Sequence, residues 1–204
     1  VAGREVREQS WKAGELAPQG AARGGRSHAV GAIGKNGGED TVLKSRAASP
    51  EDAEAIVRIY NEGIEERIAT FETSLRKAQE IVAWFDGTHA VVVVEEEGEV
   101  ISFANTTAYS PRACYSGVAE FSVYTASEAR SRGAGTLAMK ALMQAAEEAG
   151  FWKLVARVFV ENEPSRKLLL SLGFREVGIH EKHARLDGVW RDVVVVERLL
   201  PANM

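Results

Sequence analysis

The chain has 204 residues, of which 45% are hydrophobic, so it is long enough for one globular domain with a sizeable core. Its formal net charge of -4 argues against a general nucleic-acid binder, and its single cysteine, Cys114, excludes an internal disulfide framework and a cysteine-based zinc site. The longest apolar runs are far too short to cross a bilayer, and the first residues lack the apolar core of a signal peptide. We therefore expect a soluble, cytoplasmic protein without a metal, a nucleic-acid partner or a membrane partner.

Residues 1–40 differ in composition from the rest of the chain. They hold nine of the nineteen glycines, among mixed charges and few large apolar side chains. Such a segment buries too little apolar surface to offset the entropy that is lost on ordering. We expect a disordered leader over 1–40 and one packed domain over 41–204.

The first half of the packed domain reads as one strand, two helices and three further strands. Ser49 caps the first helix and Pro50 occupies its first turn, whereas Gly63 weakens its far end. An acidic turn at 96–99 is typical of a hairpin connection. The expected elements are a strand at 42–47, a helix from Ser49 onward, a loop at 68–73, a helix at 75–85, and strands at 90–95, 100–109 and 118–125.

The second half alternates helices and strands. An apolar stripe at helical spacing lies between Ala134 and Ala149, and Gly150 ends that helix. The expected elements are a helix at 134–149, a strand at 154–160, a helix at 162–172, and strands at 174–181 and 189–199. This order predicts an α/β (mixed α+β) fold, in which a mixed β-sheet carries helices on both faces.

Residues 120–136 bring a carboxylate and an anion-binding loop together. Strand alternation places Glu120, Ser122 and Tyr124 on one face of a strand. A basic, glycine-containing loop follows and leads directly into the helix that begins near residue 134. Because N–H groups at a helix N-terminus bind anions, this stretch is suited to holding an anion beside a proton acceptor.

The segment from Arg130 to Gly135 fits the pattern Arg/Gln-x-x-Gly-x-Gly/Ala. It lies between a strand and an amphipathic helix, and Asn162 and the Leu-Gly-Phe segment 172–174 follow downstream. With these features the chain resembles the GNAT N-acetyltransferase superfamily. The resemblance implies a mostly antiparallel sheet flanked by helices, with acetyl-CoA as the co-substrate.

Three further segments, at 69–73, 119–124 and 187–198, are similar to one branch of that superfamily. This branch contains the phosphinothricin (glufosinate) acetyltransferases and the arsinothricin N-acetyltransferases. The resemblance covers roughly residues 42–203 and implies a homodimer.

The same resemblance assigns roles at the site. Glu120 matches the general base that deprotonates the amine, directly or through a water; its alternative is a surface glutamate on a strand. Leu169 stands where many relatives carry Tyr and the phosphinothricin enzymes His, so Tyr124 is the remaining candidate to protonate the thiolate, unless the thiolate leaves unprotonated. The residues implied to bind acetyl-CoA are Val123, Tyr124, Thr125, Arg130, Ser131, Arg132, Gly133, Ala134, Gly135, Thr136 and Asn162. The alternatives are an ordinary strand-to-helix turn for the loop and a plain helix cap for Asn162.

Three residues are implied on the substrate side. Arg112 lies where the resembled branch keeps an arginine for its anionic substrate, and its alternative is a solvated loop charge. Tyr115 occupies another substrate-side position of that branch. Phe71 either lines a pocket or caps the core. His180 and His183 are expected to be structural or to lie at the edge of the substrate site.

The resemblance thus implies an acetyl-CoA-dependent N-acetyltransferase for the α-amino group of a small acidic amino-acid analogue. Arsinothricin, phosphinothricin and methionine sulfoximine or sulfone are the candidates, and the activity would be one of detoxification or resistance. The alternatives are the same chemistry on a protein N-terminus or polyamine, and a non-catalytic acyl-CoA sensor. Arg112 disfavours a polyamine because it would repel a cation, and an intact Glu120 disfavours the sensor.

Overall fold

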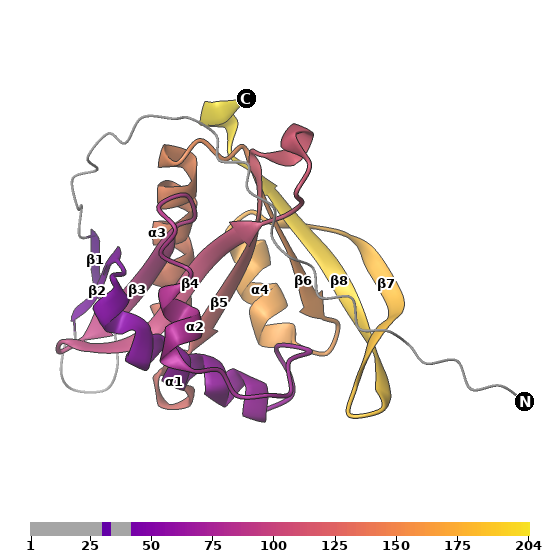
Figure 1. Cartoon of the computed structure of the whole chain (residues 1–204), viewed down its shortest axis with the longest axis horizontal. Helices are drawn as coiled ribbons and strands as arrows, with labels where there is room; N and C mark the ends of the chain where they lie inside the picture. Colours follow the sequence, from indigo (N-terminus) through magenta and orange to yellow (C-terminus); the bar gives the residue numbers. More distant parts are fainter. Residues whose placement is uncertain (1–29, 34–41) are drawn as a thin grey trace, which may run out of the picture.

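The computed structural model describes residues 30–33 and 42–204. These residues form one eight-stranded sheet in the order β1-β2-β3-β4-β5-β6-β8-β7, with four α-helices (Figure 1). The strands are β1 (Val30–Ile33), β2 (Val42–Ala47), β3 (Val91–Glu96), β4 (Glu99–Ala108), β5 (Val118–Thr125), β6 (Lys153–Phe159), β7 (Arg175–Leu186) and β8 (Val189–Leu199). The helices are α1 (Ala53–Glu65), α2 (Ala78–Val82), α3 (Ala134–Glu148) and α4 (Glu163–Ser171), with short 3-10 turns at Pro50–Asp52, Ala113–Tyr115, Ser127–Ala129 and Pro201–Asn203.

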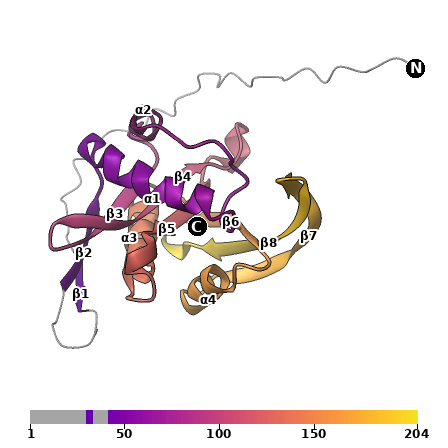
Figure 2. The ribbon, with the colours of Figure 1, turned by 90° about the horizontal axis from the view of Figure 1, so that it is seen from below.

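Neighbouring strands of the sheet are antiparallel, except for β5 and β6, which are parallel. Helices α1 and α2 cover one face of the sheet, and α3 and α4 cover the other (Figure 2). The prediction of a mixed, mostly antiparallel sheet with helices on both faces is therefore confirmed. Among the helices of the described residues, none is long and apolar enough to cross a membrane.

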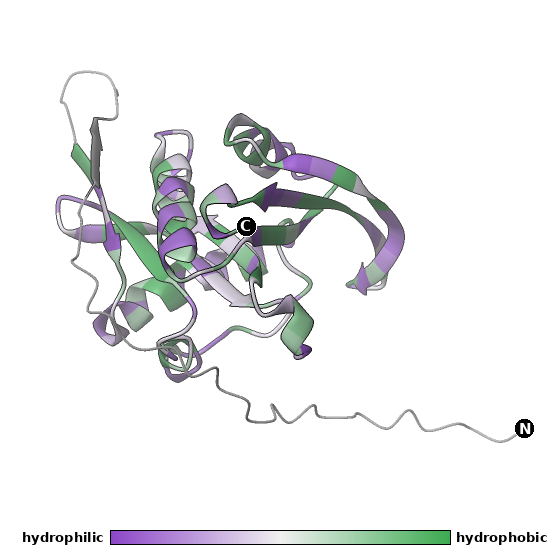
Figure 3. Cartoon of the chain, turned by 90° about the horizontal axis from the view of Figure 1, so that it is seen from above, coloured by the Kyte–Doolittle hydropathy of each residue, from purple (hydrophilic) through white to green (hydrophobic). Residues whose placement is uncertain are grey.

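The core lies where the helices pack on the central strands. Val91 to Val94 of β3 are all buried, because both faces of this strand are covered. Phe103 of β4, Ile59 of α1 and Leu142 of α3 are also buried in the core. In Figure 3 the hydrophobic colour is concentrated on the central strands, whereas the outer strand β7 is mostly hydrophilic.

Helix α1 continues through Gly63, although glycine lowers helix stability by about 1 kcal/mol relative to alanine. Glycine is required at this position because the ring of Tyr124 on β5 lies against the helix. A Cβ atom at Gly63 would lie 2.6 Å from Cε1 of Tyr124, so only glycine lets the helix and this ring approach each other so closely. This contact fixes α1 against the strand that carries the predicted catalytic residues.

Three expectations differ from the structure. Residues Val30–Ile33, which fall in the predicted disordered leader, form strand β1 and pair with Val42–Ser45, so the leader prediction is wrong for these four residues. Backbone pairing with the edge of β2 needs no strong side-chain pattern, and the surrounding glycines concealed the run. The rest of the predicted leader lies outside the described residues.

The second helix is shorter than the predicted 75–85 and covers only Ala78–Val82. The side chain of Asn61 donates to the carbonyl oxygen of Arg76 (3.0 Å) and accepts from its N–H (2.9 Å), so these backbone groups bind α1 instead of continuing a helix. Strand β7 is longer than predicted, because a bulge near Lys182 (φ 49°) lets it resume pairing with β8 as far as Leu186.

Candidate active site

Strands β5 and β6 separate at the centre of the sheet. Their parallel pairing extends over three residue pairs and ends at Glu120 and Val155. Beyond these residues β5 stays paired with β4 as far as Thr125, and β6 stays paired with β8 as far as Phe159. Within the described part of the chain, the β5 edge after Glu120 therefore has no strand beside it. An extended ligand can pair with such an edge as an added strand.

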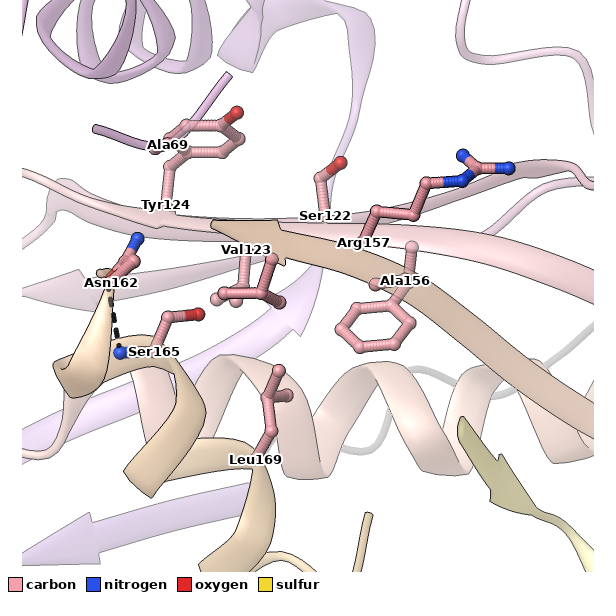
Figure 4. Close-up of a pocket in the computed structure, with 11 residues that line it drawn as sticks. Ala69, Ser122, Val123, Tyr124, Ala156, Arg157, Asn162, Ser165 and Leu169 are labelled. Carbon is pink, nitrogen blue, oxygen red and sulfur yellow. Dashed lines mark hydrogen bonds between the residues drawn. The ribbon is translucent and has the colours of Figure 1, made fainter. Parts of the chain in front are cut away.

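Two cavities occupy this opening. The larger, of about 380 Å³, is lined by Gly63, Glu66, Ile68, Ala69, Val123, Tyr124, Thr125, Ala129, Arg130, Ser131, Gly133, Gly135, Thr136, Asn162, Pro164, Ser165 and Leu168. The smaller, of about 70 Å³, lies between β5 and β6 and is lined by Ala69, Phe121, Ser122, Val123, Tyr124, Ala156, Arg157, Val158, Asn162, Ser165 and Leu169 (Figure 4). Both cavities share Val123, Tyr124 and Asn162, so they lie next to each other along the open edge of β5, and we refer to the two together as the groove.

The loop before α3 is shaped for an anion. Ser131 (φ 62°) and Gly133 (φ 91°) have left-handed backbone conformations, and Gly133 is the N-cap residue of α3. Glycine has no side chain to accept a hydrogen bond at this cap, so Gly133 leaves the first N–H groups of the helix available to a ligand. These groups and the positive end of the helix dipole favour a phosphate at this end of the larger cavity.

Nine of the eleven residues predicted to bind the cofactor line this groove: Val123, Tyr124, Thr125, Arg130, Ser131, Gly133, Gly135, Thr136 and Asn162. The other two lie elsewhere. The guanidinium of Arg132 forms an ion pair with Glu96 of β3, and the side chain of Ala134 is buried beneath the helix. Their backbone belongs to the loop, but neither side chain lines a cavity.

Two cofactor-side residues already have partners. Arg130 donates to the carbonyl oxygen of Thr125 (3.2 Å) and to Glu66 of the segment after α1 (2.8 Å). Asn162 caps α4 by accepting from the N–H of Ser165 (3.2 Å), and it donates to the carbonyl oxygen of Ile68 (3.2 Å). The predicted helix cap is therefore confirmed, and the same side chain faces both cavities.

Glu120 lies at the point where β5 and β6 separate. Its Oε1 accepts a hydrogen bond from Nη1 of Arg157 on β6 at 2.5 Å. The two side chains remain partly open to solvent, with 31% of Glu120 and 39% of Arg157 exposed. In Figure 4 Arg157 projects to the same side of the sheet as Ser122 and Tyr124. The carboxylate is thus bound by a guanidinium that projects to the same side of the sheet as Ser122 and Tyr124.

Tyr124 is packed among other aromatic rings. Its ring makes an edge contact with Tyr60 (4.7 Å between centroids) and stacks on Phe103 (5.5 Å). Burial raises the pKa of Tyr124 far above its usual value, and the nearby Tyr60 adds to the shift. The hydroxyl is therefore protonated at neutral pH and can donate a hydrogen bond. Its transfer of a proton to a thiolate, whose conjugate acid has a pKa of about 8.5, is unfavourable.

The predicted substrate-side residues lie outside both cavities. Arg112 and Tyr115 are exposed in the loop between β4 and β5, where Tyr115 makes an edge contact with Tyr109. Phe71 packs edge-on against Phe159, with 4.7 Å between ring centroids, and covers a small second core. Leu169 is buried and lines the smaller cavity.

One residue of the site, Arg157, was not predicted from the sequence. Arg157 was missed, although an arginine inside the apolar run 154–160 was a visible signal. His183, which was expected to be structural or to lie at the edge of the substrate site, follows the β7 bulge and lines neither cavity, and its ring lies 5.2 Å from that of His180. Burial, and the charges of His180 and Arg157, lower the pKa of His183, so its ring is neutral at pH 7.

Comparisons with known proteins agree with this geometry. A sequence profile of the acetyltransferase (GNAT) family matches residues 55–174. A phosphinothricin N-acetyltransferase of Streptomyces coelicolor is 29% identical over 165 residues, which cover 78% of this chain and 96% of that protein. An L-methionine sulfoximine/L-methionine sulfone acetyltransferase of Pseudomonas paraeruginosa is 27% identical over 157 residues, which cover 74% of this chain and 91% of that protein.

A solved structure is similar as well. The crystal structure of a GNAT superfamily phosphinothricin acetyltransferase from Sinorhizobium meliloti, in complex with acetyl-CoA, matches with a TM-score of 0.73 at 28% identity. The match covers 78% of this chain and 88% of that chain. Since the family profile also spans more than half of the sequence, this chain belongs to the GNAT acetyltransferase family.

Proposed function

We propose that this protein transfers the acetyl group of acetyl-CoA to the α-amino group of a small acidic amino-acid analogue. The observation that carries the proposal is the groove along the open edge of β5, which has an anion-binding loop at one end and Arg157 at the other. Glu120 lines neither cavity itself, but it lies where β5 and β6 separate and accepts a hydrogen bond from Arg157. The relatives named above acetylate phosphinothricin or methionine sulfoximine and sulfone, so these compounds are the first candidates. Acetylation removes the positive charge of the amino group, and this change would inactivate a toxic amino-acid analogue.

The cofactor would lie along the groove. Its pyrophosphate would accept hydrogen bonds from the N–H groups of Ser131–Thr136, at the N-terminus of α3. Its pantetheine amides would pair with the backbone of Val123–Thr125, which has no neighbouring strand on this side. Asn162 would contact the same arm from the start of α4. This placement brings the thioester toward Glu120, where the two strands meet.

The reaction requires that the α-ammonium group lose a proton, because an ammonium has no lone pair. Glu120 would take this proton, directly or through one water. The neutral nitrogen then attacks the thioester carbonyl and a C–N bond forms. As the C–S bond breaks and releases the thiolate, the nitrogen gives its second proton to solvent and becomes an amide. The protonated hydroxyl of Tyr124 would donate a hydrogen bond beside the acyl group, and the thiolate would take its proton from solvent. Holding amine and thioester together supplies a large part of the rate.

Thiol release from acetyl-CoA tests the proposal. The assay scans phosphinothricin, methionine sulfoximine, methionine sulfone, a polyamine and short peptides, and we expect turnover with the amino-acid analogues. Turnover confined to peptides or the polyamine would show that the proposed substrate class is wrong, while acetyl transfer to an amine would still hold. Tight acetyl-CoA binding without turnover of any amine would favour a non-catalytic acyl-CoA sensor and contradict the proposal.

A further inference from the structure

Arg157 is an unusual residue for its place in the sheet. It lies on β6, an internal strand, and within that strand it is the one exposed residue among buried or half-buried neighbours. The residues on either side, Ala156 and Val158, are buried, and its partner on β8 is Val195. Charged residues are rare in such strands, because a neighbouring apolar surface offers them no partner. A guanidinium at this position is placed to bind an anion in the opening between β5 and β6.

The anion that the structure provides is Glu120, the same carboxylate that would serve as the base. The hydrogen bond between Nη1 of Arg157 and Oε1 of Glu120 is 2.5 Å long. Arg157 also lines the smaller cavity beside Ser122 and Tyr124. The pair therefore presents a negative and a positive group side by side at the entrance for the amine.

An α-amino acid carries the complementary arrangement, because its ammonium and carboxylate are attached to one carbon atom. We propose that Arg157 binds the α-carboxylate of the substrate while Glu120 receives the α-ammonium. The internal ion pair is thereby exchanged for two ion pairs with the substrate. This inference rests on the proposed function, and it names the group that selects amino acids over other amines.

The other cations near the groove are less suited to this role. Unlike Arg157, they are paired with carboxylates other than the proposed base, Arg130 with Glu66 and Arg132 with Glu96. Arg112 lies exposed in a loop outside both cavities. A guanidinium also suits the task chemically, because it binds a carboxylate through two parallel hydrogen bonds.

Acetylation itself changes the balance of these interactions. The product has no α-ammonium, so Glu120 loses its partner on the ligand. Once Glu120 has given its proton to solvent, its carboxylate can pair again with Arg157 and compete with the product carboxylate. The same pair would thus assist both substrate selection and product release.

The test compares L-methionine sulfone with its α-carboxamide, which keeps the amine but lacks the carboxylate. The specificity constant kcat/KM is measured by thiol release for the wild type, Arg157→Gln and Arg157→Lys. We expect the wild type to prefer the acid, and Arg157→Gln to lower kcat/KM for the acid about 100-fold, mainly through KM. The amide should be almost unaffected, so the preference for the acid disappears. Arg157→Lys keeps the charge but not the paired hydrogen bonds, and should lie between the two.

Arg191→Gln is the matched control, since Arg191 forms an ion pair with Glu161 (2.6 Å) and lines neither cavity. Thermal unfolding and acetyl-CoA binding verify that each variant is folded, and Arg157→Lys decides the question if Arg157→Gln does not fold. An equal loss for acid and amide would overturn the inference and leave Arg157 as a residue that only positions Glu120. Equal wild-type activity on the two compounds would also overturn it. Absence of turnover with every amine would instead be a failure of the proposed function.

Discussion

Replacing Gly63 by alanine tests whether the close contact between α1 and the ring of Tyr124 determines the geometry of the site. The added Cβ would lie 2.6 Å from Cε1 and 2.7 Å from Cδ1 of Tyr124. Ordinary carbon contacts are about 3.5–4.0 Å, so the ring or the helix must move by about 1 Å. The ring contacts Tyr60 and Phe103, and these two contacts oppose its displacement.

Two effects of opposite sign decide the result. Alanine gains about 1 kcal/mol over glycine from helix propensity, and overpacking costs about 1–3 kcal/mol. We therefore expect Gly63→Ala to lower the free energy of unfolding by about 0–2 kcal/mol. Because Tyr124 lines both cavities, a displacement of about 1 Å should lower kcat/KM about 100-fold.

Urea unfolding of four proteins measures this contact: the wild type, Gly63→Ala, Tyr124→Leu and the double variant. In the Tyr124→Leu background the clash is absent, so Gly63→Ala should stabilise the protein there by about 1 kcal/mol. The reasoning would be refuted if Gly63→Ala stabilised the wild type by the same amount and left kcat/KM unchanged.

Two further predictions concern the loop before α3 and the stability of the protein at low pH. Gly133→Ala places a side chain on a residue with φ 91°, a conformation that disfavours side chains. We therefore expect this variant to lower the free energy of unfolding by about 1 kcal/mol or more, and to weaken acetyl-CoA binding. Unchanged acetyl-CoA affinity by calorimetry would argue against this loop as the phosphate site. The pKa of Asp52 is lowered from its ordinary value of 3.8, chiefly by the hydrogen bonds of its carboxylate with Arg46. The Asp52 carboxylate therefore contributes fully to stability above pH 3.8, the pKa of the unfolded state. This contribution is lost as the pH falls through the lower pKa of the folded state. In urea unfolding, the stability difference between wild type and Asp52→Asn should therefore stay constant from pH 7 to pH 5 and shrink below about pH 4; a difference that persists at lower pH would contradict this.

Local patterns in the sequence predicted much of the fold, because they depend on residues close together in the chain. Strand alternation placed β5 at the observed bounds, and the glycine-containing loop marked the start of α3. The shortening of α2 was not predictable in this way, because it depends on Asn61 reaching Arg76, fifteen residues away.

In the site too, features set by neighbouring residues were predictable, and features that depend on distant residues were not. Most residues predicted for the cofactor line the groove, since they belong to one continuous strand–loop–helix segment. The pairing of Glu120 with Arg157 joins residues that are 37 positions apart, and it follows only from the parallel register of β5 and β6. Placing Arg132 outside the groove likewise required the position of Glu96 on a different strand.

The central claim is that Glu120 accepts the proton of the amine that is acetylated. Glu120→Gln tests it most directly, because glutamine keeps the size of the side chain and can still accept the hydrogen bond of Arg157, but it is a far weaker base. With the amine and acetyl-CoA both saturating, thiol release should fall about 100- to 10,000-fold while the affinity for acetyl-CoA is unchanged. Wild-type turnover by Glu120→Gln across the whole pH range would contradict the account.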